Sequence, residues 1–569
     1  MAPKKPNRNL QGRSGEEQPF WTANRIWLAW IGIIAVFVLM RATIINIPLE
    51  RDEGEYAYIA QQAMHGAVPY RDAFDQKPPG IFAIYTAGMF IFGRSAEAIH
   101  FFMFLCTLGT MGLLYRLVRR LCGTGAGLLA ALVLGIITAE KGVLGSAANT
   151  EIFMLLPLVG SLLCLVPKEG RPGWWRIVGA GALAAAACWI KQVAAMDAAF
   201  LALWLVVAHF SGSERRGFGR LILEEGALIL GAVLATAPVI IYFYATGAMK
   251  DFIYCVFTYN ISYATTNIDV LDRGWGPFAD KFGKILAGDG LLWAALAAGL
   301  VWLAARGRRK LLLYFAGFLT LSFVGVCIGG YFRPHYFLQI APAVAALAGL
   351  GLAWLLGRIA GAGERTGRWL GYAAVTVAVV ALPVYANRDI LFAASPATAS
   401  VILYGPTPFV FSSELGKEVE EHTQPGDTIL VAGTEPQIAF FSRRKNATRY
   451  IFFNPLAAPK GTPGLEENQK QALDEIRRAK PKVIVNLLGI YGGTIFTTQS
   501  DPYFETELAK YIREEGYGVV DYWQALPEGA HPEMLNRFGR LMPADIAAEE
   551  KRTGRKVPTQ YMTTVLFRP

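Results

Sequence analysis

Residues 26–47 read IWLAWIGIIAVFVLMRATIINI, and three residues later the chain continues as RDEGEYAYIAQQAMHGAVPYRDAFDQKPPG, residues 51–80. The first stretch is apolar over about the 20 residues that a helix needs to cross a bilayer. It is too long for the core of a signal peptide and has no small-residue cleavage site. The sequence therefore predicts a first transmembrane helix, after which a charged and aromatic loop emerges at one face of a membrane.

The composition of the whole chain also indicates a membrane protein. Hydrophobic residues make up 53% and charged residues only 17% of the 569 positions, which is too apolar for a soluble globular protein. The net charge of +10 does not point to nucleic acid, because the lysines and arginines lie in short clusters between apolar runs, as in cytoplasmic loops. All six cysteines precede residue 395, so no disulfide framework is expected in the polar C-terminal part.

Further apolar runs predict about eleven transmembrane helices in all. A shorter run at 80–92 is expected to lie in the interface. With a cytoplasmic tail at 1–24, this count places the clusters around Arg119, Arg216 and Arg309 inside, in agreement with the positive-inside rule. After the first span, the runs lie at about 97–115, 124–139, 150–166, 175–190, 193–210, 221–246, 288–305, 311–329, 335–356 and 369–386.

The predicted topology divides the chain into three parts. They are the cytoplasmic N-terminal tail at 1–24, a transmembrane part at 25–390 and an extracytoplasmic part at 395–569. The outer face of the transmembrane part receives a first loop at 47–96 and a long loop at 247–286.

The part after residue 395 has the pattern of a soluble α/β domain, because short runs with high β-propensity alternate with helical ones. The predicted fold is therefore a polytopic α-helical membrane protein with a C-terminal soluble α/β domain. Strands are expected at 428–432, 448–453, 482–487, 518–523 and 561–567, and helices at 470–479 and 504–515.

The first outer loop carries groups that could perform chemistry. Asp52 and Glu53 directly follow the first span, and Lys77 precedes a double proline. Two adjacent acids alone would indicate a solvated loop. Here a candidate base and a candidate anion-binding cation share one loop, and a transfer reaction needs both.

Three more ionisable residues, Lys191, Arg333 and His335, lie at the same predicted face. Basic residues there run against the positive-inside bias, and ionisable residues at membrane depth favour function. We therefore predict that they join Lys77 in a cationic cradle for a phosphate, although a lysine near the end of a span also snorkels. A histidine metal cluster is not expected, because the sequence has only six histidines and no HExxH motif.

The long loop at 247–286 is rich in aromatic residues, among them Tyr259. Such a density suits the lipid–water interface. It is typical either of an interfacial anchor or of a flap over a lipid substrate, and the sequence leaves both open.

Taken together, these motifs resemble the GT-C glycosyltransferases that use polyprenyl-phosphate sugars, such as protein O-mannosyltransferases and the lipid A aminoarabinose transferase. The likeness covers roughly residues 25–390. It rests on Asp52-Glu53 with Tyr56, on Tyr70-Arg71-Asp72, on Lys77-Pro78-Pro79-Gly80, on Asn149-Thr150-Glu151 and on His335-Tyr336.

The resemblance implies roles for individual residues. Asp52 matches the family's catalytic aspartate, Lys77 matches a lysine that contacts the donor phosphate, and Glu151 falls where relatives have a second acid; Glu53 is a further catalytic candidate. Glu55 stands where the aminoarabinose transferase has a basic residue, so the sugar and the acceptor cannot be copied across. A divalent cation held by Asp52 and Glu151 stays open. The substrate cavity is expected to include Tyr56, Tyr70, Arg71, Asp72, Tyr259 and Tyr336.

The predicted function is transfer of a sugar from a polyprenyl-phosphate donor to a lipid, glycan or protein acceptor at the outer face of a membrane, expected to be a bacterial inner membrane. A single base without a covalent carboxylate intermediate implies inversion. A transporter or flippase of lipid-linked sugars is the alternative, although the sequence shows no paired repeats with broken helices. A receptor or assembly protein that acts through residues 395–569 is a third possibility.

Overall fold

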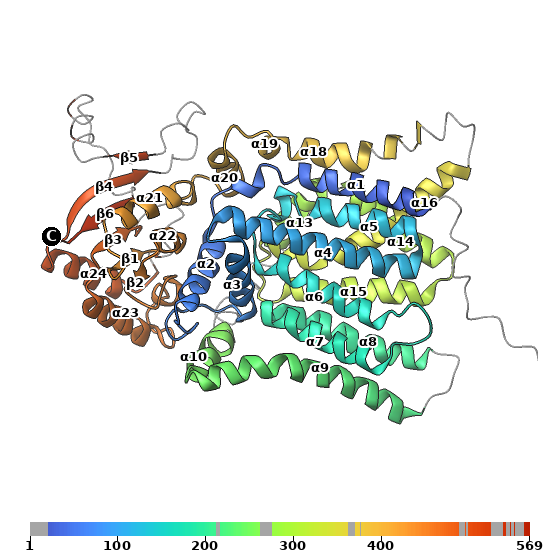
Figure 1. The fold of residues 1–569 in the computed structure, drawn as a ribbon, viewed down its shortest axis with the longest axis horizontal. Coiled ribbons are helices and arrows are strands. Elements are labelled where there is room, and N and C mark those ends of the chain that lie inside the picture. Colours follow the sequence, from blue (N-terminus) through green and yellow to red (C-terminus); the bar gives the residue numbers. More distant parts are fainter. Residues whose placement is uncertain are drawn as a thin grey trace, which may run out of the picture.

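The protein has a bundle of apolar helices at one end and a β-sheet with its own helices at the other (Figure 1). In Figure 1 the apolar helices lie side by side along the long axis of the molecule. The computed structural model describes residues 21–211, 217–261, 276–288, 290–361, 370–371, 373–375, 377–488, 496, 499–524, 539–541, 547, 551 and 563–568.

The bundle is built from helices whose ends follow from local sequence. Helix α4 is an example. It begins where the Ser95 hydroxyl accepts a hydrogen bond from the Ala98 amide. It ends at Gly123, whose φ of 97° few residues other than glycine adopt. The helices are α1 (Ala23–Leu39), α2 (Arg51–Met64), α3 (Gly80–Phe92), α4 (Ala96–Cys122), α5 (Thr124–Ile137), α6 (Thr150–Leu165), α7 (Trp174–Ile190), α8 (Ala195–Phe210), α9 (Phe218–Ala245), α10 (Met249–Ile253), α13 (Gly276–Gly288), α14 (Gly290–Ala305), α15 (Arg309–Cys327), α16 (Ala341–Gly361), α18 (Leu382–Ala386) and α19 (Arg388–Leu391).

Short segments of other helix types lie between these helices, and one of them, η5, carries residues of the site. They are the 3₁₀ segments η1 (Ile44–Asn46), η2 (Lys141–Val143), η3 (Gln192–Ala194) and η5 (Pro334–Ile340), and the π-helical segments η4 (Tyr254–Thr258) and η6 (Val377–Ala381).

Five helical segments among the described residues are long and apolar enough to cross a membrane. A sixth results if the bent pair Phe278–Ile285 and Gly290–Ala305 counts as one span. The other apolar helices, including α1, α5, α6 and α7, have only 10–17 residues. These segments support an integral membrane protein, whereas the count of eleven spans stays a prediction. The five are Ala96–Cys122, Gln192–Phe210, Phe218–Ala245, Arg309–Cys327 and Pro334–Ile359.

Glycines let several helices of the bundle approach closely. A Cβ at Gly181 of α7 would collide with the carbonyl oxygen of Leu228 in α9, and a Cβ at Gly231 of α9 would collide with that of Val178 in α7. Helix association within lipid relies on such close packing, because lipid tails are as apolar as the side chains.

The predicted first outer loop, 47–96, is mostly helical. Its charged half forms α2, whose first turn is closed by a capping box between Glu50 and Glu53. Its apolar half forms α3. A short strap at 65–79 joins the two helices and carries Lys77.

The C-terminal unit, residues 396–568, contains a six-stranded sheet in the order β2-β1-β3-β6-β4-β5. Strands β2, β1 and β3 are parallel, while β6 pairs antiparallel with β3 and β4, and β5 pairs antiparallel with β4. The elements are α20 (Pro396–Tyr404), α21 (Phe409–Glu421), β1 (Thr428–Ala432), α22 (Gln437–Ser442), β2 (Lys445–Asn446), η7 (Asn454–Leu456), α23 (Leu465–Ala479), β3 (Val483–Asn486), α24 (Tyr503–Glu514), β4 (Gly518–Gln524), β5 (Gly539–Leu541) and β6 (Thr563–Phe567).

Four of the five expected strands coincide with β1, β3, β4 and β6, and the two expected helices with α23 and α24. The strand expected at 448–453 is wrong. Only the short β2 precedes it, because the backbone there bonds to α23 and to the strap: the Arg449 amide donates to Glu475, and its carbonyl accepts from Phe74. β5 was not expected from the sequence.

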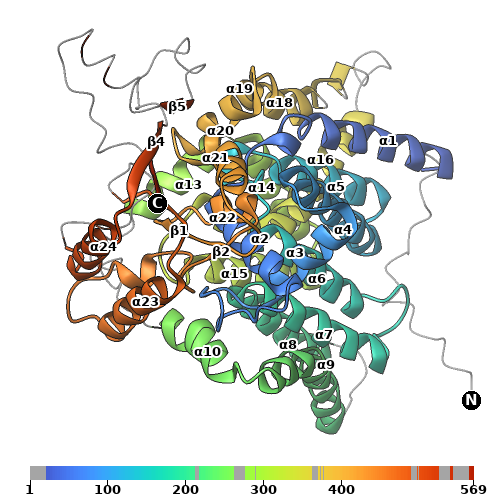
Figure 2. The same cartoon turned by 60° about the vertical axis from the view of Figure 1, so that its left-hand side comes forward.

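The C-terminal unit sits directly on α2 (Figure 2). Arg51 pairs with the fully buried Glu435 at 2.7 Å. Gly54 lies so close to Gln437 of α22 that a Cβ would collide with it, and the Tyr58 hydroxyl accepts a hydrogen bond from the Asn446 amide at 2.8 Å. The charged face of α2 is therefore enclosed between the bundle and the sheet.

Candidate functional site

A cavity of about 530 Å³ lies where the bundle meets the C-terminal unit. Its wall combines the start of α2, the strap, the segments at the ends of α5–α6, α7 and α15, and two stretches of the C-terminal unit. The lining residues are Glu50, Arg51, Asp52, Glu55, Phe74, Asp75, Gln76, Lys77, Leu144, Asn149, Thr150, Glu151, Lys191, Tyr259, Arg333, His335, Tyr336, Leu403, Tyr404, Thr407, Phe409, Phe452, Asn454 and Pro455.

Asp52 and Lys77 form an ion pair in this wall. Asp52 lies in the first turn of α2, where the helix dipole favours a carboxylate. The Lys77 Nζ lies 3.4 Å from the Asp52 carboxylate and donates to the Tyr56 hydroxyl at 2.9 Å. Burial raises the pKa of Asp52, but Lys77, His335 and Arg333 act against it and hold that pKa well below its ordinary value. Asp52 is therefore a charged carboxylate at neutral pH.

The strap fixes the backbone of Lys77 from both sides. The Tyr70 hydroxyl donates to the Lys77 carbonyl at 2.7 Å, and the Lys77 amide donates to the Asp75 carboxylate at 2.9 Å. Tyr70 itself is fully buried against Phe82, Phe243 and other rings. The lysine thus stands on a rigid backbone, while its ammonium faces the cavity.

Glu151, Lys191 and His335 form a second cluster. Lys191, at the end of α7, donates to Glu151 in the first turn of α6, and the His335 Nε2 lies 3.7 Å from the same carboxylate oxygen. The Thr150 hydroxyl donates to the other oxygen at 2.8 Å. The Lys191 ammonium also lies 4.0 Å from the ring centre of Tyr336. Both carboxylate oxygens of Glu151 therefore already have protein partners.

The four residues of the predicted phosphate cradle therefore line one cavity, although they are far apart in sequence. They do not act alike in this geometry. Lys77 bonds a partly exposed carboxylate and a tyrosine, whereas Lys191 and His335 share a buried glutamate. Arg333 lies in the wall with its guanidinium 5.9 Å from the Tyr331 ring centre.

Tyr259 and Tyr336, two of the aromatic residues expected in the cavity, line it. Tyr259 packs edge-on against Phe74 of the strap at 5.1 Å. Tyr56 reaches the site through its hydrogen bond with Lys77. Residues 262–275 of the long loop lie outside the described residues, so the choice between anchor and flap stays open.

Glu53, Tyr70, Arg71 and Asp72 do not line the cavity. The buried Glu53 carboxylate pairs with His100 at 3.0 Å and caps the start of α2. Tyr70 acts on the site only through its hydrogen bond to the Lys77 carbonyl. Arg71 and Asp72 pair with each other at 2.9 Å on the outside of the strap.

Sequence reasoning did not assign three acids of the wall: Glu50, Glu55 and Asp75. Burial raises the pKa of Asp75 to about 6, although Lys77 opposes the effect. Burial, reinforced by Asp75, also raises the pKa of Glu55 well above its ordinary value. The available signal was their place in the charged stretch 51–80, which contains Glu55 and Asp75, or directly before it, as for Glu50. The stretches 403–409 and 452–455 of the wall had no motif at all.

A further buried acid, which does not line the cavity, was also missed. Asp197 in α8 accepts hydrogen bonds from Ser322 of α15 and, at 2.7 Å, from Gln339 of η5. Because η5 also carries His335, this polar contact inside the bundle fixes one wall of the site.

A metal site gains no support from the part of the chain that the structure describes. No three His, Cys, Asp or Glu side chains are grouped there so as to hold a metal ion. Asp52 and Glu151, the two carboxylates considered for this role, each face a lysine instead.

Part of the chain is similar in sequence to a known protein family, and its fold is similar to solved structures. Residues 76–242 match the family model described as dolichyl-phosphate-mannose-protein mannosyltransferase. No curated protein matches the chain.

The solved structures that share the fold include the following two. ArnT from Cupriavidus metallidurans in the apo state aligns with a TM-score of 0.55 at 14% identity, over 96% of this chain and 99% of that one. The archaeal oligosaccharyltransferase AglB from Archaeoglobus fulgidus, in complex with an inhibitory peptide and a dolichol-phosphate, aligns with a TM-score of 0.53 at 13% identity, over 92% of this chain and 75% of that one. The family match and the shared fold together confirm the resemblance to the GT-C glycosyltransferases that use polyprenyl-phosphate-linked sugars.

Proposed function

We propose that this protein is a membrane glycosyltransferase that moves a sugar from a polyprenyl-phosphate donor to an acceptor hydroxyl or amine. The observation that carries the proposal is the cavity in which the charged carboxylate of Asp52 lies 3.4 Å from Lys77, with Arg333 in the same wall. Lys77 falls within the segment that matches the mannosyltransferase family. The dolichol-phosphate in the AglB complex, which has the same fold, supports a lipid-phosphate ligand.

In the proposed reaction Asp52 is the general base. It takes the proton from the acceptor hydroxyl or amine as the acceptor atom bonds to the anomeric carbon. The bond from that carbon to the phosphate oxygen breaks, and the lipid phosphate leaves with the electron pair. One displacement without a covalent intermediate inverts the anomeric centre.

Lys77 has two roles in this account. In the free protein it holds the pKa of Asp52 low, which makes Asp52 a weak base. A donor phosphate would compete for the same ammonium and weaken its hold on Asp52. Donor binding would thereby raise the basicity of Asp52 and at the same time place a cation where charge develops on the leaving group.

Glu151, Lys191 and His335 have a different role in the proposal. Because Lys191 already donates to Glu151, it meets the phosphate only if that pair rearranges, and the His335 Nε2 lies 3.7 Å from the same carboxylate. We assign the cluster to holding the shape of the cavity beside Asp52, with Arg333 as the second direct phosphate ligand. The phosphate cradle is thereby reduced from the four residues expected from the sequence to Lys77 and Arg333.

The proposal places the cavity and the C-terminal unit outside the cytoplasm. The basic loops of the sequence support this orientation. A phosphatase reporter fused after residue 395 should be active outside the cytoplasm, and one fused near Arg309 should be inactive. Reversed activities would contradict the orientation.

The function itself is tested with purified protein and a polyprenyl-phosphate-linked sugar. We expect free polyprenyl phosphate to appear only when acceptor is present, and mass spectrometry should detect the sugar on the acceptor with the inverted linkage. Lipids and envelope glycans of cells with and without the protein identify the natural sugar and acceptor. Movement of the intact donor across vesicles without cleavage would favour a flippase instead.

A further inference from the structure

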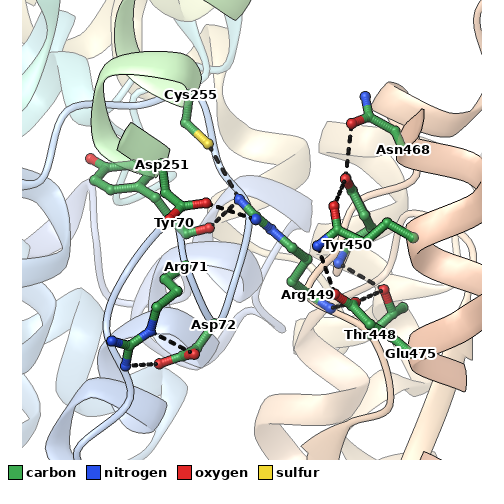
Figure 3. A network of polar contacts seen from close by, with 11 residues as sticks. Tyr70, Arg71, Asp72, Asp251, Cys255, Thr448, Arg449, Tyr450, Asn468 and Glu475 are labelled. Carbon is green, nitrogen blue, oxygen red and sulfur yellow. Dashed lines mark hydrogen bonds and ion pairs between the residues drawn. The ribbon is translucent and has the colours of Figure 1, made fainter. Parts of the chain in front are cut away.

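Arg449 of the C-terminal unit reaches into the membrane part at a point where three distant segments meet (Figure 3). Its guanidinium donates to the Asp251 carboxylate of α10 at 2.8 Å and to the Tyr70 carbonyl of the strap. Its own carbonyl accepts from the Phe74 amide at 2.8 Å. The arginine therefore bonds the strap twice and α10 once, but it does not line the cavity.

Arg449 is held firmly from the C-terminal side. Its amide donates to the Glu475 carboxylate of α23 at 2.9 Å, and the neighbouring Thr448 hydroxyl donates to the same oxygen at 2.8 Å. The Arg449 side chain is only 11% exposed. A guanidinium so enclosed depends on its partners, because leaving a buried charge unpaired is costly. Its orientation toward the strap is thus fixed by α23.

The contact with Tyr70 bears directly on Lys77. Tyr70 has a φ of 70°, a conformation that few non-glycine residues adopt. Three hydrogen bonds hold it there: its amide donates to Ala73, its hydroxyl donates to the Lys77 carbonyl, and its carbonyl accepts from Arg449. A continuous chain of hydrogen bonds therefore runs from Arg449 through Tyr70 to the backbone of Lys77.

The contact with Asp251 fixes the other side of the strap. Asp251 lies in α10, which continues through the π-helical η4 to residues 259–261. There the Asn260 side chain donates to the Gln76 carbonyl at 2.6 Å, and Tyr259 packs on Phe74. One arginine thus ties together the two segments that hold residues 74–77 between them.

We propose that Arg449 is a positioning residue for the lipid-phosphate subsite: it joins the strap to α10 and so sets the place of the Lys77 ammonium. The identity of the ligand rests on the proposed function, whereas the positioning of the strap does not. The C-terminal unit would thereby contribute to donor binding through a residue about 370 positions away from Lys77 in sequence.

Hydrogen–deuterium exchange of the full-length protein tests the positioning without any ligand. In Arg449→Ala, the amides of residues 70–77 should exchange faster than in the wild type, and Arg449→Lys should be intermediate because a lysine cannot span both acceptors in the same geometry. Asp251→Asn keeps the arginine and should give a smaller change in the same direction. The matched control is Arg477→Ala on α23, which removes an exposed pair with Glu507 of α24 and should leave these amides unchanged. Unchanged exchange at 70–77 in Arg449→Ala would overturn the proposal.

Binding of a polyprenyl phosphate then tests whether Arg449 acts through Lys77. Arg449→Ala should weaken binding roughly tenfold, the scale of one lost hydrogen bond to a charged group. The same change made in a Lys77→Ala background should have little further effect, because coupled residues are not additive. Equal losses in both backgrounds would contradict action through Lys77. Faster exchange at 70–77 with unchanged binding in both single variants would leave Arg449 as an anchor of the strap and would refute the proposed phosphate ligand.

Discussion

Two carboxylate–lysine pairs face the same cavity, but the protein closes around them to different degrees. Asp52 and Lys77 are 3.4 Å apart, and their side chains are 26% and 17% exposed. Glu151 and Lys191 are in direct contact and only 2% and 10% exposed. The Thr150 hydroxyl also donates to Glu151, whereas no hydroxyl group among the described residues donates to Asp52.

From this comparison we propose that burial, rather than residue type, separates the reactive pair from the supporting one. A partly exposed ion pair has a small net strength and can exchange its partner for a ligand. A buried pair is costly to break, because removal of one partner leaves the other charge unpaired. We therefore assign transfer chemistry to the pair on α2 and the strap, and stability to the pair on α6 and α7.

The largest effect is expected from breaking the buried pair. Glu151→Gln should lower the free energy of unfolding by about 3 kcal/mol, since it leaves Lys191 with a neutral partner. The double variant Glu151→Gln with Lys191→Met should recover part of that loss. Thermal and denaturant unfolding in detergent measure both. If Asp52→Asn destabilised the protein as strongly, the contrast between the two pairs would be lost.

Breaking the partly exposed pair of Asp52 and Lys77 should lower activity by a comparable amount without lowering stability. Lys77→Ala should reduce kcat/KM by about 100-fold, because the phosphate is charged in the ground state and gains charge as the sugar leaves. Lys191→Ala, whose ammonium is already engaged, should change donor binding far less. Equal losses of donor binding in both variants would instead support a symmetrical cradle.

The pH dependence of activity gives a more moderate effect. Burial raises the pKa of Asp52 and Lys77 is the largest opposing influence, so Lys77→Gln should raise that pKa. Since the base must be ionised, kcat/KM of the variant should begin to fall at a higher pH than in the wild type as the solution is acidified. Residual activity measured across pH tests this, and an unmoved acid limb would contradict the coupling of the two residues.

The smallest effect is expected on the outside of the strap. Arg71→Ala removes an exposed pair with Asp72 and should change the free energy of unfolding by no more than about 0.5 kcal/mol. Sugar transfer should stay close to that of the wild type. A loss of donor binding in this variant would show that the cavity extends further along the strap.

Sequence alone predicted the parts of the site that local chemistry marks. Asp52 follows an apolar run, and Lys77 stands before a double proline, so both were visible as a charged stretch beside a span. Lys191, Arg333 and His335 were found because interruptions of apolar runs fall at one predicted face. Their presence in one cavity agrees with that inference.

The remainder depends on tertiary packing that no local pattern contains. The pairing of Glu151 with Lys191 requires α6 and α7 to meet. Glu53 points toward His100, whereas the adjacent Asp52 lines the cavity. The run at 448–453 has the composition of a strand, but contacts with α23 and the strap override its propensity. The contacts of Arg449 also depend on tertiary packing, so no local sequence pattern indicated its role.

The most direct test of the central claim compares two carboxylates in a single-turnover assay of sugar transfer. Each variant is loaded with donor first, so that binding and chemistry are measured apart. Asp52→Asn should bind donor and remain folded while the rate of transfer falls by at least about 100-fold, the usual scale for loss of a general base. Transfer at a near-normal rate by Asp52→Asn, together with a collapse of transfer in folded Glu151→Gln, would contradict the account and move the base to the buried pair.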